Sequence, residues 1–275
     1  MSEAWRVPVL TYHGLHAPAW DYHENDHVAL EADLAMLRDL GFRIVPLSVL
    51  VAHRFEQPVP GLEGRKLAAI SFDDGTDLDY RDFSHPDYGY LKSFNNLLLA
   101  QPGLGWDGGV PRGTSFVIAS PEARTELDKT CIAGRGQWGD EWWAEAIATG
   151  ALEIANHSWD HTHPTLKQLA VDLRHQGGFA SIQDFETADT EILRAEQFIR
   201  EKTGRRSVPL FAYPYGEWND FLAEKYFPSR EGWFSAAFTT EGRHLTADSS
   251  RWSLPRYVCG EHWNSPEGLK TILLD

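Results

Sequence analysis

The sequence contains only two cysteines, Cys131 and Cys259, among 275 residues. Two are too few for a disulfide scaffold or a thiolate metal site, so both are interpreted as free thiols, and we expect no catalytic cysteine. Basic residues are also scarce. The chain has 25 Lys and Arg against 40 Asp and Glu, which gives a net charge of -15 at pH 7. This excess of negative charge argues against a nucleic acid or an anionic membrane as the partner and leaves a neutral glycan as the more natural guest.

Long apolar segments are absent as well. No run approaches the roughly 18 residues that a membrane helix needs, and residues 1–6 show no basic stretch leading into an apolar segment. We therefore expect no membrane insertion and a cytoplasmic location for the sequence as it stands, or a periplasmic or extracellular one if a leader had been removed. A chain of 275 residues suits one large α/β domain, residues 1–275, that buries about three quarters of its unfolded surface.

Strand-like and helix-like segments alternate along the chain. Alternation of this kind indicates a parallel sheet, either open or closed into a (β/α) barrel. The seven expected strands are Val7–Tyr12, Arg43–Pro46, Lys66–Phe72, Thr114–Ile118, Leu152–Ala155, Val208–Ala212 and Ala236–Thr239.

Two segments between these strands have clear helical signals. Leucines from Leu30 to Leu40 recur at helical spacing before Gly41, and Thr187–Lys202 repeats the pattern. Residues 77–113 break the alternation, because they hold many aspartates and aromatic residues and end in a glycine-rich stretch. We interpret this region as an inserted loop and helix that shapes substrate specificity, with Asp77 or Asp79 as a remote candidate for an extra metal ligand.

Two adjacent carboxylates follow one of the expected strands. Lys66–Phe72 is apolar almost throughout, which is typical of a strand buried on both faces, and Asp73, Asp74 and Gly75 come directly after it. Ligand-bearing loops of α/β folds gather at the carboxyl ends of strands. Because neighbouring side chains there point in different directions, one carboxylate can bind a metal while the other acts as a base. The alternative is an ordinary Asp-Asp-Gly turn.

A histidine pair follows another expected strand. Leu152–Ala155 leads into His157 and His161, whose spacing would place both imidazoles on one face of a helical turn. Together with Asp74 they form a two-histidine, one-carboxylate set, which zinc accepts while keeping a position open for water. Iron oxygenases use the same set, but Asp73 and the parallel pattern argue against that interpretation. A histidine pair of this spacing alone would more often be two surface residues.

These motifs resemble the polysaccharide deacetylases of carbohydrate esterase family 4, the NodB-homology domain. The first motif of that family resembles Phe72–Gly75, the second resembles His157–His161, and the third resembles Tyr213–Gly216. Val9–His13 and Leu254–Tyr257 are similar to recurring stretches of the branch with an amino-terminal Tyr-His motif and no carboxy-terminal catalytic histidine. The resemblance spans nearly the whole chain in family order, and the Asp-Asp-Gly and histidine motifs are its specific part.

The resemblance implies a distorted (β/α) barrel of about seven strands and hydrolysis of N-acetyl groups on an amino-sugar glycan, with release of acetate. Asp73 would be the general base that takes a proton from metal-bound water. Asp74, His157 and His161 would hold a divalent metal ion, Zn²⁺ in the first place, with Co²⁺, Ni²⁺ or Mn²⁺ as alternatives. The backbone N–H of Tyr215 would help to hold the oxyanion.

Two departures from the family pattern concern the catalytic groups. The third motif of the family commonly begins with an arginine that pairs with the catalytic carboxylate, but Ala212 occupies the matching position, so a different cation would have to orient Asp73. The usual carboxy-terminal histidine, the general acid of the family, is also missing from Gly268–Asp275.

His13 is the expected replacement for that acid. It ends the first expected strand on the same rim as Asp73, and an imidazole can donate a proton near neutral pH. In the similar bacterial exopolysaccharide (poly-N-acetylglucosamine) deacetylases, a Tyr-His at this place lies in the active site. The alternatives are a structural role for His13, or His163, His244 or His262 as the acid. His163 could also replace His161 as a ligand.

The chain is rich in tryptophan, with 11 residues, and flat aromatic faces can bind sugar rings. Since most large aromatic residues belong to the core, we expect only a few to contact the substrate, and the residues proposed for this contact are Tyr213, Pro214, Trp159 and Trp218.

Two other functions compete with the glycan deacetylase. One is a metal-dependent amidohydrolase of the same fold that acts on a small non-carbohydrate amide or another non-peptide C–N bond, which an enclosed pocket would favour. The other is a catalytically silent glycan-binding relative, suggested by Ala212 and the missing histidine. The presence of Asp73 argues against the silent relative, because binding alone needs no base.

Overall fold

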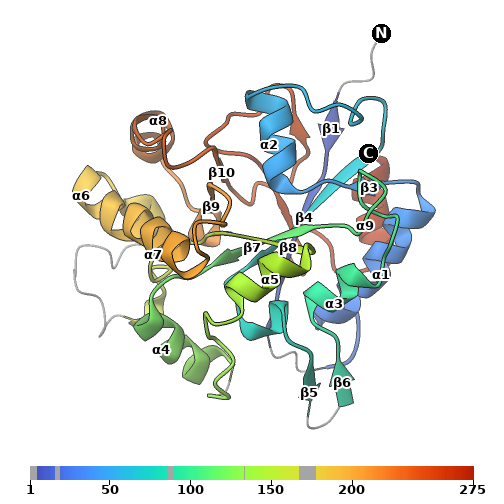
Figure 1. Ribbon diagram of the computed structural model, residues 1–275, viewed down its shortest axis with the longest axis horizontal. Helices are drawn as coiled ribbons and strands as arrows, with labels where there is room; N and C mark the ends of the chain where they lie inside the picture. Colours follow the sequence, from blue (N-terminus) through green and yellow to red (C-terminus); the bar gives the residue numbers. More distant parts are fainter. Residues whose placement is uncertain (1–4, 16–18, 86–88, 133, 167–177) are drawn as a thin grey trace.

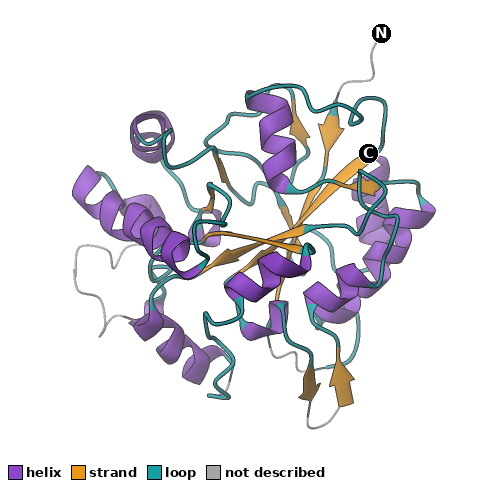
Figure 2. Ribbon diagram, in the orientation of Figure 1, coloured by secondary structure: helices purple, strands orange, loops and turns teal. Residues whose placement is uncertain are grey.

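A curved sheet of parallel strands forms the centre of the molecule (Figures 1 and 2). The computed structural model describes residues 5–15, 19–85, 89–132, 134–166 and 178–275. Seven strands follow one path, and β3 (Arg43–Ile44) pairs with β4 outside that path. The order along the path is β10 (Ala236–Phe238), β9 (Leu210–Ala212), β8 (Leu152–Asn156), β7 (Gly113–Val117), β4 (Leu67–Asp73), β2 (Val9–His13) and β12 (Tyr257–Val258).

Every pairing in this sheet is parallel, and the sheet curls into a half-barrel. The predicted distorted (β/α) barrel is therefore confirmed, and each of the seven expected strand segments overlaps a strand of this sheet. β12 was not among them. It pairs with β2 in the register Tyr257 to Leu10 and Val258 to Thr11, which places the last strand of the chain beside one of the first.

β4 shows why a central strand of this sheet has no polar alternation. All seven of its residues are buried, and alternate side chains point to opposite faces of a strand. Ala68, Ile70 and Phe72 join the larger apolar cluster on one face, whereas Leu67 and Ala69 join a second cluster on the other. Both faces are covered, and the strand ends at Asp73, which is its one charged residue.

Helices cover both faces of the sheet, and the two predicted helices are confirmed. The first is α1, which begins after Asn25, whose side chain accepts from the His27 N–H, and ends just before Gly41 with its φ of 80°. The second runs through α6, a π-helical segment at Asp189–Leu193 and α7. The α-helices of the described chain are α1 (Asp26–Asp39), α2 (Leu47–Phe55), α3 (Phe94–Leu99), α4 (Pro121–Cys131), α5 (Trp143–Thr149), α6 (Phe185–Ala188), α7 (Arg194–Lys202), α8 (Phe227–Ser229) and α9 (Pro266–Leu274).

Residues 77–113 contain more structure than the predicted loop and helix. After a 3₁₀ turn at Asp77–Asp79, β5 (Phe83–His85) and β6 (Gly89–Leu91) pair antiparallel and project from the body of the molecule (Figure 1), and α3 follows. Periodicity did not reveal these two strands because each has only three residues.

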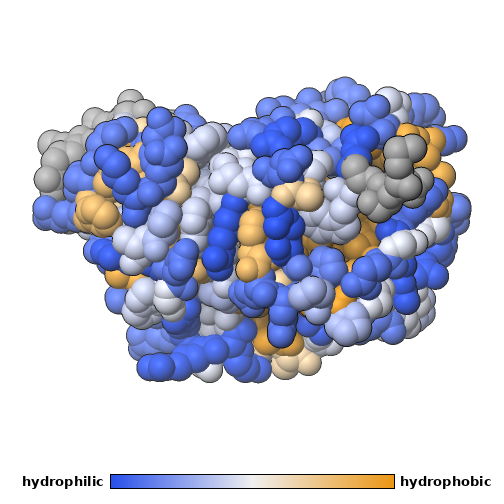
Figure 3. All heavy atoms as spheres, turned by 90° about the horizontal axis from the view of Figure 1, so that it is seen from above, coloured by the Kyte–Doolittle hydropathy of each residue, from blue (hydrophilic) through white to orange (hydrophobic). Residues whose placement is uncertain are grey.

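The remaining strands, β1 (Arg6–Val7) and β11 (Leu245–Thr246), pair antiparallel outside the main sheet. The face drawn in Figure 3 is mostly hydrophilic, interrupted by small hydrophobic areas. Among the residues described, no helix has the length and apolar character needed to cross a membrane.

Candidate functional site

The predicted site residues meet at the carboxyl edge of the sheet. His13 ends β2 and Asp73 ends β4, and the two residues are partners in the parallel register. His157 follows the end of β8, two strands further along the sheet. Parallel strands bring their carboxyl ends to one edge, which explains how segments far apart in the chain supply one site.

Among the described residues, Asp74, His157 and His161 form a group that could hold a metal ion, the candidate metal-ligating cluster. Their candidate ligand atoms all lie within 4.8 Å of one another. Asp74 Oδ1 is 3.7 Å from His157 Nε2 and 3.6 Å from His161 Nε2. One carboxylate and two imidazoles are a donor set suited to zinc or a similar divalent cation.

The orientation of His157 fits a metal ligand. Its Nδ1 lies 2.9 Å from the carbonyl oxygen of Ala212, so this nitrogen carries the proton and donates it. The lone pair of Nε2 is therefore directed toward Asp74, as in metal sites whose second ring nitrogen is held by a backbone acceptor. Ala212 thus takes part in the site through its carbonyl group.

The two histidines come together through an irregular loop, which corrects the predicted helical turn. His157 and His161 lie in a segment without regular helix, and their ring centroids are 4.7 Å apart. Side chains organise the loop, because Asn156 Oδ1 accepts from the Ser158 N–H and Ser158 Oγ accepts from the His161 N–H. The predicted local conformation was therefore wrong, whereas the prediction that both histidines bind one cation stays a prediction.

Unusual backbone conformations concentrate around this site. Positive φ angles in residues other than glycine are strained, and such residues cluster at functional positions. In the described chain only Arg205 adopts such an angle elsewhere. The others surround the metal-ligating cluster: Asp74 (76°), Ser158 (73°), His161 (65°), Thr162 (48°) and Tyr215 (55°).

Arg256 is the cation that orients Asp73. Its Nη1 donates to Asp73 Oδ1 at 2.6 Å and its Nη2 donates to Oδ2 at 2.8 Å, and both side chains are buried. Burial alone would raise the pKa of Asp73, but the charge of Arg256 outweighs it and holds this pKa well below its usual range. The family arginine missing at Ala212 is therefore replaced by an arginine that immediately precedes β12.

A pocket of about 330 Å³ opens beside the cluster. Its polar wall carries Asp73, both metal-ligating histidines and His13. The apolar part of the lining is formed by Leu15, Ile118, Leu127, Cys131, Trp138 and Val258. A small acyl group with a polar, hydrolysable bond could therefore contact both parts of the lining.

The four candidate acids divide by their relation to this pocket. His13 and His163 line it, whereas His244 and His262 do not. The backbone N–H of His13 donates to Asp26 at 2.7 Å, and its ring Nδ1 lies 4.0 Å from the same carboxylate. Burial lowers the pKa of His163. His13 remains the predicted acid, and His163 remains the alternative.

Among the other predicted residues, Tyr215 alone reaches the pocket. It is half-exposed, and its ring lies edge-on against His161 with centroids 4.5 Å apart. Tyr213 and Pro214 are buried, and the guanidinium of Arg194 covers Trp159 at 3.7 Å. These three residues and Trp218 are not among the residues that line the pocket. Substrate contact by the four stays a prediction.

Trp138 is a site residue that sequence reasoning missed. Its Nε1–H donates to the backbone carbonyl of Asp74 at 3.1 Å, and the Ile118 N–H donates to the same oxygen at 3.3 Å. These bonds hold Asp74 in its left-handed conformation. The segment that carries Trp138 is in turn anchored by Asp77, which accepts from the Gly139 N–H at 2.7 Å. No spacing pattern in the sequence links this tryptophan to Asp74.

The remote candidates for extra ligands have other partners. Asp77 accepts from the backbone N–H of Gly139, the residue after Trp138. Asp79 is fully buried and accepts from Ser115 Oγ at 2.6 Å. Burial raises the pKa of Asp79 well above its usual value. Neither residue belongs to the metal-ligating cluster found among the described residues.

Comparison with known proteins agrees with this geometry. Residues 112–226, which include both histidines, match the model of the family described as polysaccharide deacetylase. No curated protein matches the chain. This match covers less than half of the chain, so it supports the polysaccharide deacetylase family for that segment.

Three similar structures show how widely the fold is shared. The Streptococcus pyogenes deacetylase PplD, solved with acetate, is 16% identical, with a TM-score of 0.64 over 98% of this chain and 99% of that one. IcaB from Ammonifex degensii is 20% identical, with a TM-score of 0.62 over 99% and 97%. A de-N-acetylase from Aggregatibacter actinomycetemcomitans is 14% identical, with a TM-score of 0.59 over 97% and 99%. At these identities the likeness shows the fold.

Proposed function

We propose that this chain is a polysaccharide deacetylase that uses a divalent metal ion, with Zn²⁺ as first choice, to hydrolyse N-acetyl groups of an amino-sugar glycan and release acetate. The observation that carries the proposal is the buried bidentate pair of Asp73 and Arg256 beside the cluster of Asp74, His157 and His161. A metal site alone could be structural, but an ionised carboxylate held next to it in a pocket is the arrangement that hydrolysis needs.

The residues of the cluster fit a divalent cation, which when bound would polarise the amide carbonyl and make water acidic enough to attack near neutral pH. Asp73 would take the proton of the attacking water. Its Oδ2 lies 3.8 Å from His157 Nε2, close to the metal-ligating atoms. Because Arg256 keeps its pKa low, Asp73 is ionised at neutral pH and is therefore free to accept a proton.

Breaking the amide bond also requires an acid and a partner for the developing oxyanion. His13, beside Asp73 in the sheet, would give a proton to the amine as the C–N bond breaks. The acetyl carbon keeps the oxygen of water and leaves as acetate, and the sugar keeps the amine. The backbone N–H of Tyr215 would stabilise the oxyanion.

Arg256 also bears on the alternative of a silent glycan-binding relative. That alternative was motivated by the missing partner of Asp73 and by the missing carboxy-terminal histidine, and Arg256, just before β12, supplies the partner. A binding protein has no use for a buried carboxylate held ionised at the edge of a metal site. The amidohydrolase acting on a non-carbohydrate compound remains the competing function that experiment must separate.

The decisive experiment measures acetate released from N-acetylglucosamine oligomers and from a polymeric N-acetylated amino sugar. Protein reconstituted with Zn²⁺, Co²⁺, Ni²⁺ or Mn²⁺ is compared with protein treated with a chelator. We expect metal-dependent release that ceases on chelation and returns when metal is added. Metal bound at the cluster without acetate release from either substrate would contradict the proposal and favour the non-carbohydrate amidohydrolase.

A further inference from the structure

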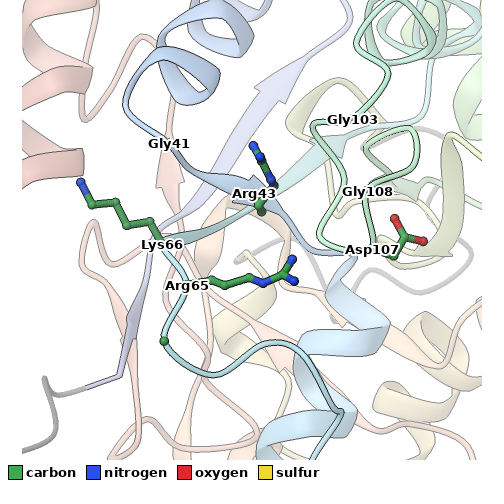
Figure 4. A pocket seen from close by; sticks show the side chains of 8 residues that line it. Gly41, Arg43, Arg65, Lys66, Gly103, Asp107 and Gly108 are labelled. Atoms are coloured by element: carbon green, nitrogen blue, oxygen red, sulfur yellow. The ribbon is translucent and has the colours of Figure 1, made fainter.

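A second cavity lies at the opposite end of the sheet from the metal-ligating cluster. It has a volume of about 630 Å³ and surrounds the start of β3 at Arg43 and the residues that precede β4 (Figure 4). This volume lies within the range of pockets for organic ligands, about 300–1,000 Å³. Its lining consists of Gly41, Arg43, Gly64, Arg65, Lys66, Gly103, Asp107 and Gly108.

Four glycine turns explain why this cavity is hollow. Gly41, Gly64, Gly103 and Gly108 have φ angles of 80°, 69°, 85° and 84°, and nothing lies within 4 Å of the place where a Cβ atom would stand on each. A positive φ favours glycine. The walls therefore carry no side chains at these four places, and the space between the turns stays open.

Three cationic side chains line this cavity. They are positioned by other groups but are not neutralised by an acidic partner among the described residues. No carboxylate of the described residues pairs with Arg43, Arg65 or Lys66, although the whole chain has a net charge of -15. The two guanidinium groups are positioned by backbone carbonyls, because Arg43 Nη1 donates to Phe42 O at 3.2 Å and Arg65 Nη1 donates to Trp106 O. In Figure 4, Arg43 and Arg65 extend between the chain at Gly41 and the loop of Gly103 and Gly108, and Lys66 extends on the other side.

A smaller hollow of about 250 Å³ adjoins the cavity and shares Asp107 with it. Its lining includes the apolar side chains of Val49, Trp106 and Val110, together with Asp107 and Arg112. Asp107 is a carboxylate in the lining of both hollows, and its Oδ1 accepts from the Gly109 N–H at 2.9 Å. The two hollows together present cations, one hydrogen-bond acceptor and an aromatic surface.

We propose that these two hollows form one binding site for a phosphorylated sugar compound such as a nucleoside phosphate. Arg43 and Arg65 bind the phosphate groups, because guanidinium forks match phosphate oxygens. Lys66 adds charge at the rim, Asp107 accepts a sugar hydroxyl, and Trp106 covers the apolar part. The net negative charge of the protein does not prevent this, since charges beyond about 8 Å are screened at physiological ionic strength.

Binding of uridine diphosphate, uridine and inorganic phosphate, each measured by calorimetry on the full chain, tests the site. We expect uridine diphosphate to bind tightest, phosphate more weakly and uridine not measurably. The double variant Arg43→Gln/Arg65→Gln should weaken uridine diphosphate binding at least tenfold and leave acetate release unchanged. Arg243→Gln is the matched control, since it removes an exposed cation that already pairs with Glu241 and does not line the cavity, and it should leave binding unaffected.

Three results would overturn the site: no binding of uridine diphosphate, binding that the double variant does not weaken, or equal affinity for phosphate and uridine diphosphate. If the double variant does not fold, the salt dependence of binding to the unmodified protein replaces it. Affinity should fall steeply between 50 and 300 mM NaCl, to about the extent expected when cations bind phosphates, and an affinity independent of salt would refute the assignment. These measurements do not depend on the proposed deacetylase activity.

Discussion

The two ends of the central sheet differ in which residues form the left-handed turns and in whether the charged side chains beside these turns are paired. At the carboxyl end, residues with side chains, among them Asp74 and His161, adopt positive φ angles alongside Gly75 and Gly216, and the charge of Asp73 is paired with Arg256. At the amino end, positive φ angles are adopted by glycines such as Gly41 and Gly108, and the neighbouring cations are unpaired.

This difference shows which turns need their side chains. A residue other than glycine in the left-handed conformation destabilises the fold by roughly 1–2 kcal/mol. Such a residue therefore persists where its side chain is needed at that position. Asp74 in such a turn directs its carboxylate toward two imidazoles. A glycine such as Gly108 avoids that strain and leaves space. Strain therefore marks the end of the sheet where chemistry is expected, and empty turns mark the end where a ligand could enter.

Asp73→Asn is expected to have the largest effect at the carboxyl end. The amide cannot accept a proton, so turnover should fall by roughly 10²–10⁴-fold or more, while the metal stays bound because Asp74, His157 and His161 are intact. Acetate release and metal content are measured on the same sample. His157→Ala is the control that should lose the metal. Loss of metal from Asp73→Asn would refute the division of roles between the two aspartates.

Arg256→Gln should rank second, because it removes the charge pairing that distinguishes this end. Asp73 would remain buried without its cation, which typically costs about 3–5 kcal/mol. In the unmodified protein the folded pKa of Asp73 lies below its unfolded value of about 3.9. Asp73 therefore stabilises the fold above that pH, and the contribution is lost as the pH falls through the folded pKa.

The variant should consequently be most destabilised near neutral pH and less so in acid, and the acidic limb of its rate profile should move to higher pH. Urea unfolding at pH 7 and pH 4 checks the first point, and acetate release as a function of pH checks the second. Arg243→Gln, which breaks an exposed pair with Glu241, should change stability by about 1 kcal/mol or less. Equal effects of the two variants would remove the distinction between buried and surface pairs.

Trp138→Phe should weaken the strained turn at Asp74 without removing a ligand. The phenyl ring keeps most of the packing but cannot donate to the Asp74 carbonyl, and a change of this kind typically lowers metal affinity by about 10–100-fold. Competition with a coloured chelator measures the affinity directly. Trp142→Phe is the matched control, since its buried Nε1 has no partner. An unchanged affinity in Trp138→Phe would show that Ile118 alone holds the turn.

The smallest effects are expected from placing a side chain in a glycine turn and from placing glycine in a left-handed turn formed by another residue. Gly108→Ala has open space for its Cβ but must keep a φ of 84°, so it should lose roughly 1–2 kcal/mol of unfolding free energy. Arg205→Gly, at an exposed residue with a φ of 60° outside both sites, should gain a comparable amount. Thermal unfolding of both variants checks the signs. A loss for both would mean that conformational strain does not separate the two classes of turn.

The sequence predicted the central strands well because burial on both faces leaves a nearly continuous apolar run, as in Lys66–Phe72. It also pointed to Asp74, His157 and His161, which follow such runs and which the structure brings together, whereas their role as metal ligands stays a prediction. The conformation around His157 and His161 could not be predicted, since hydrogen bonds from Asn156 and Ser158 decide it. Spacing alone suggested a helix where the chain forms an irregular loop.

Arg256 marks another limit of sequence reasoning. The stretch Leu254–Tyr257 stood out by resemblance, yet nothing in it points to Asp73. Their contact depends on β12 pairing with β2, and β12 has only two residues, too few for a recognisable pattern. Trp138 is similar, because its bond to Asp74 depends on how residues 134–140 fold against Asp77.

The pairing of β12 with β2 also determines when the site can form. Asp73 and Arg256 are 183 residues apart in the chain, so nearly all of the sheet must be made before the two can meet. A chain emerging from the ribosome carries Asp73 long before its counter-charge exists, and contacts at such separation form slowly. The base of the site is therefore completed late in folding, and partly synthesised chains would hold a water-exposed carboxylate where the finished protein has a buried, paired one.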